Sequence, residues 1–339
     1  MSEHQPAPAR ANPDRWVGRR GIVRDAFAAR SRSMTEQLIE RLFQRPSRIG
    51  RFGLPPAGLV ALAMIGATLL LVVASTGWGS PSDEHAYWLA GRHLLDGAPL
   101  YDPTATAVTP YAFWYTPIVA QVMAPIVAIL PSGAFTIAWT MLLLGCVWWL
   151  AGGRLLPALA LVAFPPVAIE LWFRNVHLVL AVLVVLGIRR SSLLFVPAAA
   201  VKFSPGLGIV YLAARARWRE AALVIAAGAG FLAVSYALSP EAWRAFVDIL
   251  AARGPTDISG FLPVPYIGRV GAAFVLALVA GRLRPRIGEP LLVVSIVLAL
   301  PTLWFTALAT LAALVPILRR RPEDVPVQRP PIRPGDGER

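Results

Sequence analysis

The feature that most constrains the fold of this 339-residue chain is a series of long apolar runs separated by short polar segments. They cover residues 56–76, 116–130, 134–151, 155–171, 176–188, 193–214, 221–238, 261–281 and 291–318. About 20 apolar residues suffice for a helix to cross a bilayer. Charged residues make up only 15% of the chain, too few to cover the surface of a soluble fold. The sequence therefore predicts an all-α polytopic integral membrane protein.

Basic residues are concentrated in the two flanks of the chain, which has a net charge of +13. In so apolar a chain, basic flanks indicate the cytoplasmic side of a membrane rather than nucleic-acid binding. We expect residues 1–54 to form a cytoplasmic Arg-rich segment and residues 319–339 a cytoplasmic disordered tail. Residues 55–318 would form the membrane domain, placed in a bacterial plasma membrane with both termini inside.

Residues 77–114 form the longest polar segment between two apolar runs, and they contain few basic residues. This pattern favours a large first loop on the extracytoplasmic side. Within the loop, residues 83–95 mix apolar and polar positions in a way that predicts a helix along the membrane surface. Gly97 should end this helix.

Two apolar runs have basic residues at both ends, which conflicts with a single crossing. We expect the runs 193–214 and 291–318 to turn back as pairs of short helices, with tips at residues 202–206 and at Pro301. The proline-rich run 116–130 is the strongest candidate for a re-entrant element. Broken helices of this kind are tolerated where they line a protein-walled cavity. The expected total is eight to eleven transmembrane or re-entrant helices.

The outer loop carries adjacent carboxylates, Asp83 and Glu84, at the start of its expected helix. A carboxylate at the mouth of a membrane cavity can accept a proton from an attacking hydroxyl. The alternative is that both acids only complement the helix dipole. Tyr115 belongs to an aromatic stretch, residues 111–117, for which an interfacial aromatic belt is the favoured interpretation.

Lys202 and His177 lie within apolar runs, and Arg174 lies between two of them. Lys202, the only lysine, is costly there unless it faces water or an anion, such as a phosphate; a pair with Glu170 is the alternative. The guanidinium of Arg174 also suits a phosphate, but it could instead reach the membrane interface. For His177 we favour a packed interfacial position over catalysis.

Metal and cofactor motifs are missing from the sequence. The single cysteine and four scattered histidines show no ligand spacing, so we expect no metal site. No glycine-rich dinucleotide-binding motif is present either. We therefore expect no cofactor.

Several short patterns together resemble glycosyltransferase family 87, of the GT-C superfamily of membrane glycosyltransferases. They are Asp83-x-x-x-Tyr87-x-x-Ala90, Gly97-x-x-x-Tyr101-Asp102, Tyr115-Thr116-Pro117 with Ala124-Pro125, the Arg174-Asn175 corner, and Lys202-x-x-Pro205. The resemblance extends over residues 56–318. It implies Asp83 as general base, Arg174 and Lys202 as ligands of a donor phosphate, and Asn175 as a residue that orients the sugar or phosphate. Glu84, Tyr87, Tyr115 and His177 are accessory candidates.

The same resemblance implies transfer of a sugar from a polyprenyl-phosphate donor to an envelope glycolipid or glycan outside the cytoplasm. Mannose is the favoured sugar, and arabinofuranose is possible. A transporter or flippase of a lipid-linked sugar is the alternative from another class, although the halves of the chain show no clear repeat. A third interpretation is a catalytically inactive family member, because Phe173-Arg174-Asn175 lacks the glutamine of the usual Gly-Gln-x-Asn corner.

Overall fold

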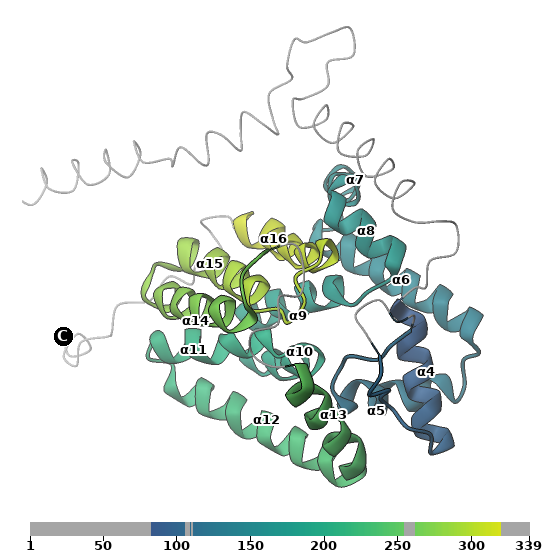
Figure 1. Ribbon diagram of the computed structural model, residues 1–339. Helices are drawn as coiled ribbons and strands as arrows, with labels where there is room; N and C mark the ends of the chain where they lie inside the picture. The colour runs from purple at the N-terminus through teal and green to yellow at the C-terminus, as the bar shows by residue number, and fades with distance from the viewer. Residues whose placement is uncertain (1–82, 106–108, 110, 254–261, 320–339) are drawn as a thin grey trace, which may run out of the picture. The chain divides into compact units, whose positions relative to one another are not determined.

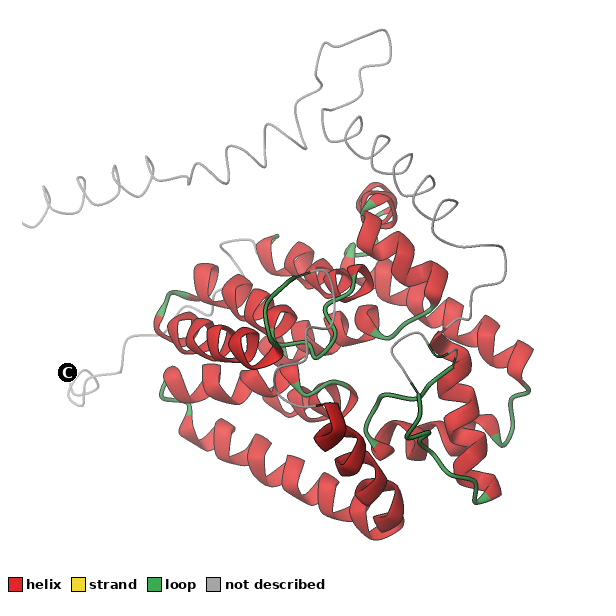
Figure 2. Ribbon diagram, in the orientation of Figure 1, coloured by secondary structure: helices red, strands yellow, loops and turns green. Residues whose placement is uncertain are grey.

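The computed structural model describes residues 83–105, 109, 111–253 and 262–319, and throughout these residues the secondary structure is helical, without strands (Figure 2). The α-helices are α4 (Asp83–Asp96), α5 (Pro117–Val127), α6 (Ser132–Leu150), α7 (Leu155–Ala163), α8 (Pro165–Phe173), α9 (His177–Arg189), α10 (Phe195–Val201), α11 (Leu207–Ala214), α12 (Trp218–Leu238), α13 (Pro240–Arg253), α14 (Tyr266–Arg282), α15 (Pro285–Leu298) and α16 (Leu314–Leu318). Short 3-10 helices are η1 (Ser192–Leu194), η2 (Ser204–Gly206) and η3 (Phe305–Ala313). The prediction of an all-α fold is confirmed.

Two of the described helices, α6 and α12, are long and apolar enough to cross a membrane. The pair α7 and α8 makes a third candidate span, bent by 82° at Phe164, where Pro165 begins the second helix. Only 17% of the apolar window of α12 is buried, so its large side chains face outward as lipid-facing residues do. The run 56–76, the segment 1–54 and residues 320–339 lie outside the described part. The predicted number of crossings therefore stays a prediction.

Both helix breaks expected in the doubly flanked runs are present. The chain leaves α10 at Lys202, passes through η2 and continues as α11. A Cβ atom on Gly208 would lie 2.7 Å from the ring of Phe195, so α11 packs directly against α10. In the second run, α15 ends before Pro301, and η3 and α16 fold back onto it. The run 116–130 forms only the eleven-residue helix α5.

Helix α13 was not expected, because its sequence contains no apolar run. Its charged residues interrupt the pattern, while Trp243 and Phe246 turn inward, and Phe246 is only 4% exposed. Phe246 packs at ring-centroid distances of 5.7 Å from Tyr101 and 6.1 Å from Phe203. Helix α13 thus packs over the break that follows α10.

A buried arginine holds the second break together. Arg269, on α14, is 2% exposed and donates hydrogen bonds to the carbonyl oxygens of Leu298, Leu300 and Pro301 at 3.2, 2.7 and 2.9 Å. These carbonyls have lost their helical donors where α15 ends. Figure 1 shows α14 and α15 side by side, as this connection requires.

Helices α6 and α9 share one direction in the bundle. Helix α6 starts beside α4, and the carbonyl that follows its last residue, that of Ala151, accepts a hydrogen bond of 2.9 Å from Arg319. Helix α9 ends at Arg189, which donates to the carbonyl of Pro316. The basic residues Arg189 and Arg319 therefore lie at the C-terminal ends of α9 and α6.

Candidate active site

Helix α4 is the first described element, and it presents Asp83 and Glu84 in its first turn. It ends where Gly97 adopts a φ of +66°, as the sequence predicts. Gly91 permits the close packing of α4 on α5, because a Cβ atom there would lie 2.8 Å from Val127 Cγ2. Asp83 and Glu84 are therefore fixed to the bundle.

The side chain of Asn175 links helix α4 to the corner between α8 and α9. Its Nδ2 donates a hydrogen bond to Oδ2 of Asp83. Its Oδ1 accepts from the hydroxyls of Tyr87 and Tyr115 at 3.2 and 3.1 Å, and from the backbone N–H of Val176 at 2.7 Å. The two tyrosine hydroxyls are 2.8 Å apart. The amide is therefore locked in one orientation by partners from three parts of the chain.

The pKa of the Asp83 carboxyl is raised from 3.8 to about 6, and burial is the largest cause. The negative charge of Glu170 also raises this pKa, and that of Glu84 does so weakly. The charge of Lys202 and the hydrogen bond from Asn175 lower it. Asp83 is thus a stronger base than an ordinary aspartate and still largely ionised at neutral pH.

Arg174 adopts a left-handed conformation, with φ of 53°, and its side chain turns towards α4. Its Nε lies 2.7 Å from Oε1 of Glu84, whose side chain is 2% exposed. Thr136 of α6 also donates to Oε1 of Glu84, at 3.2 Å. Glu84 therefore forms an ion pair with Arg174. Because Nε of Arg174 faces Glu84, only its Nη atoms are left for the predicted phosphate role.

Glu170 is completely buried on α8 and pairs with His177 rather than with Lys202. Its Oε2 lies 3.0 Å from Nδ1 of His177, and its Oε1 accepts the backbone N–H of His177 at 2.5 Å. The Lys202–Glu170 pair considered from the sequence is absent: the structure places no ion pair between them within the described residues. The lone acid of the run 155–171 signalled a buried partner, but the sequence could not show which one.

Lys202 lies at the break after α10, as the sequence predicts. Its Nζ is 4.6 Å from the centroid of the Tyr115 ring, a cation–π distance. No described carboxylate lies within salt-bridge distance of this ammonium. A bound anion would supply the ion pair that this ammonium lacks among the described residues. Lys202 is therefore the described cation best placed to bind an anion.

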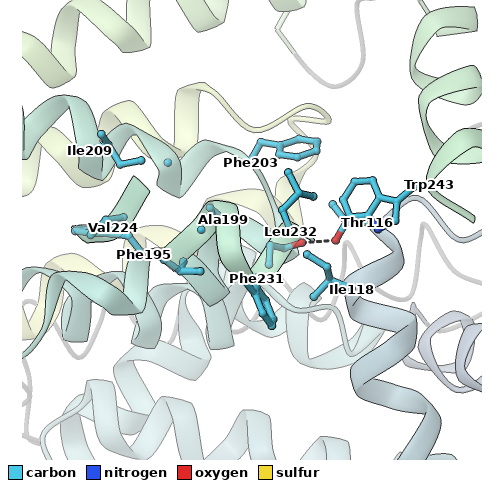
Figure 3. Close-up of a pocket in the computed structure, with 14 residues that line it drawn as sticks. Thr116, Ile118, Phe195, Ala199, Phe203, Ile209, Val224, Phe231, Leu232 and Trp243 are labelled. Carbon is cyan, nitrogen blue, oxygen red and sulfur yellow. Dashed lines mark hydrogen bonds between the residues drawn. The ribbon is translucent and has the colours of Figure 1, made fainter. Parts of the chain in front are cut away.

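A cavity of about 160 Å³ adjoins this cluster between α5, α10, α11, α12 and α13 (Figure 3). Its wall is almost wholly apolar, and it includes Phe195, Phe203, Phe231 and Trp243. Thr116, which follows Tyr115, donates a hydrogen bond of 2.6 Å to the carbonyl of Ala200 in this wall (Figure 3). The lining of the cavity thus includes Thr116 and Phe203, the residues that follow Tyr115 and Lys202 in the chain.

Of the predicted site residues, the structure brings together Asp83, Tyr87, Tyr115, Asn175 and Lys202. Glu84 and Arg174 form a pair beside them, and His177 lies behind the corner on Glu170. In the described part of the chain, no three His, Cys, Asp or Glu side chains are arranged to hold a metal ion. This constellation can accept a proton at Asp83 and hold an anion at Lys202.

The sequence model of glycosyltransferase family 87 matches residues 113–328. The chain belongs to glycosyltransferase family 87. It is a membrane glycosyltransferase. Comparisons with curated proteins and with solved structures each gave no match.

The family match includes Tyr115, Arg174, Asn175 and Lys202, whereas Asp83 precedes it. The membership of the chain in family 87 therefore says nothing direct about helix α4. The place of Asp83 in the site rests on its hydrogen bond to Asn175, inside the matched region.

Proposed function

We propose that this family 87 member transfers a sugar from a polyprenyl-phosphate donor to an envelope glycolipid or glycan on the extracytoplasmic side of a bacterial plasma membrane. Mannose is the favoured sugar, and arabinofuranose is the second choice. The observation that carries the proposal is the carboxylate of Asp83, held by Asn175 in a cluster that also contains the lone lysine.

Asp83 acts as the general base in this proposal. Asn175 donates to Oδ2, which leaves Oδ1 to take the proton from the acceptor hydroxyl as that oxygen attacks the sugar. The pKa of about 6 lies nearer to neutral pH than that of an ordinary aspartate, which favours proton transfer at neutral pH. The acceptor attacks opposite the leaving phosphate, so a β-linked donor gives an α-linked product.

Lys202 holds the donor phosphate and stabilises the charge that remains on it when the bond to the sugar breaks. Its ammonium rests on the Tyr115 ring without a carboxylate partner among the described residues. The Nη atoms of Arg174 are the second candidate ligand, while its Nε faces Glu84. This arrangement uses no metal to bind the phosphate.

The apolar cavity beside Lys202 supports a lipid-linked donor over a nucleotide-linked one. A lipid chain attached to the phosphate could occupy this aromatic and aliphatic cavity, whose lining includes Phe203, the residue after Lys202. A nucleotide would need hydrogen-bond donors and acceptors for its base and ribose, which this apolar wall does not offer. The hydroxyl of Thr116 already donates to the carbonyl of Ala200. The chemistry of the wall therefore agrees with an alkyl or prenyl phosphate.

The test is transfer by purified protein in nanodiscs, supplied with extracted envelope lipids and radiolabelled polyprenyl-phosphate mannose or its arabinofuranose analogue. We expect label in the lipid or glycan product with the wild type and with Glu220→Gln, a carboxylate-to-amide control on α12. Asp83→Asn should give none above background. The same protein reconstituted in liposomes tests the alternative: movement of labelled donor across the membrane without product would favour a transporter. Absence of both transfer and transport with either donor would favour an inactive family member.

A further inference from the structure

Glu170 binds most of the backbone donors of the corner that carries Asn175. Its backbone carbonyl accepts the N–H groups of Arg174 and Asn175, the latter at 3.3 Å. Its Oε1 accepts those of His177 and Leu178 at 2.5 and 3.4 Å.

The one remaining N–H in the stretch, that of Val176, goes to Oδ1 of Asn175 itself. All five consecutive backbone donors from Arg174 to Leu178 are thus satisfied by Glu170 or by Asn175. These bonds compensate for the left-handed turn at Arg174, which is an unfavourable conformation for a side chain with a Cβ atom.

We propose that Glu170 is a positioning residue for the transfer reaction: it fixes the corner from Arg174 to Leu178, and the corner in turn holds Asn175 against the carboxylate of Asp83. The inference rests on the proposed role of Asp83 as general base. Glu170 itself is completely buried and is not placed to touch substrate.

Glu170 has a second effect on Asp83 through its charge. Among the charged groups around Asp83, Glu170 contributes most to raising the pKa of Asp83, ahead of Glu84 on the same helix, and Lys202 opposes it. The neutral groups that face Asp83 are Asn175, Tyr87 and Tyr115, while Arg174 is paired with Glu84 and His177 with Glu170. The side chain of Glu170 therefore both fixes the corner by hydrogen bonds and raises the pKa of Asp83 by its charge. Different substitutions separate these two effects.

Three variants separate the two effects. Glu170→Gln keeps an acceptor oxygen for the two N–H groups and removes the charge. Glu170→Asp keeps the charge and draws the oxygens back by one methylene. Glu170→Ala removes both, and Glu220→Gln serves as the matched control, a carboxylate paired only with Arg217 within the described residues.

The first measurement does not depend on activity. The carboxyl band of Asp83, assigned by its loss in Asp83→Asn, is titrated by infrared spectroscopy. We expect a midpoint near pH 6 in the wild type and in Glu220→Gln, and a lower midpoint in Glu170→Gln, because a negative charge that favoured the protonated form is gone. An unchanged midpoint in Glu170→Gln would overturn the electrostatic half of the proposal.

The second measurement is kcat for sugar transfer across pH. We expect Glu170→Ala to lower kcat about ten- to a hundredfold, because Asn175 and Asp83 lose their fixed orientation. Glu170→Gln should recover much of kcat with its acid limb moved to lower pH, and Glu170→Asp should lower kcat without that move. Should Glu170→Ala fail to fold, Glu170→Asp carries the geometric test.

Wild-type kcat in both Glu170→Ala and Glu170→Asp would overturn the positioning role. A failure of the proposed general-base role gives a different result from a failure of the positioning role. If Asp83→Asn still transfers sugar, the general base lies elsewhere, whereas the infrared midpoint continues to report whether Glu170 acts on Asp83.

Discussion

The amide of Asn175 donates a hydrogen bond to the carboxylate of Asp83 across 92 positions of sequence. This contact joins helix α4, which precedes the family match, to the corner between α8 and α9 inside it. The position of Asp83 on α4 therefore depends on the position of Asn175 at the corner. The first two predictions concern the carboxylate of Asp83.

Replacing Asp83 by Asn should lower the transfer rate about 10²- to 10⁴-fold, the usual loss when a general base is removed. Donor binding, measured with labelled lipid, should persist because Lys202 and the cavity are unaltered. An asparagine oxygen can still accept the hydrogen bond from Asn175, so the fold should be retained. Near-normal transfer would contradict the assignment and make Glu84 the next candidate.

The raised pKa of Asp83 gives a predicted pH dependence of rate and of stability. Transfer should rise with pH through about 6, as the base becomes ionised. The folded state binds this proton more tightly than the unfolded state does, so the contribution of Asp83 to stability falls as pH rises from about 4 to above 6. Melting curves should show Asp83→Asn more stable than the wild type at pH 7.5, with no such gain at pH 4.

Lys202→Met should weaken donor binding about ten- to a hundredfold, the equivalent of one hydrogen-bonded charge. Its melting temperature should not fall, because Lys202 has no carboxylate partner among the described residues. Arg92→Met, which removes an exposed cation of α4 paired with Asp96, is the matched control and should leave donor affinity unchanged. A fall in melting temperature that Glu170→Gln reverses would instead point to a structural lysine.

Arg174→Met should lower the melting temperature by several degrees, because it leaves the buried carboxylate of Glu84 without its cation. Adding Glu84→Gln should restore most of the loss. Donor affinity of the double variant then reports whether Arg174 also contacts the phosphate, since the ion pair no longer contributes. An unchanged melting temperature in Arg174→Met would contradict the importance of the pair.

The topology predicts that Arg190 and Arg219, both exposed, face the cytoplasm and that Asp96 faces outward. Single cysteines at these positions, on a Cys146→Ser background, should react with a membrane-impermeant reagent from the corresponding side. The carbonyls bound by Arg189 and Arg319 agree with a common side for these helix ends. Labelling of position 219 from outside would contradict the hairpin at residues 193–214.

Local signals were sufficient for several elements of the fold. Acids at the start and Gly97 at the end defined α4, and Pro205 with Gly206 marked the break beside Lys202. Helix α13 was missed, because its burial comes from Trp243 and Phe246 packing on a distant aromatic cluster rather than from an apolar run.

The partners in the site were harder to predict than the residues. Asp83, Asn175 and Lys202 were singled out by residue type and by the resemblance to the family. The pairing of Arg174 with Glu84 and of Glu170 with His177 depends on how α4, α6 and α8 pack, which no local pattern contains. The single arginine in the apolar run 261–281 is itself a signal that Arg269 is buried against polar partners.

The three carbonyls bound by Arg269 lie 29, 31 and 32 residues after it in the chain. A ribosome therefore completes α14, with its buried guanidinium, well before it makes the acceptors at the end of α15. During biosynthesis α14 can settle into its final surroundings only together with the segment that follows it. We therefore expect the last apolar run to fold together with α14, and a chain terminated just after Leu298 would lack two of these three carbonyl acceptors.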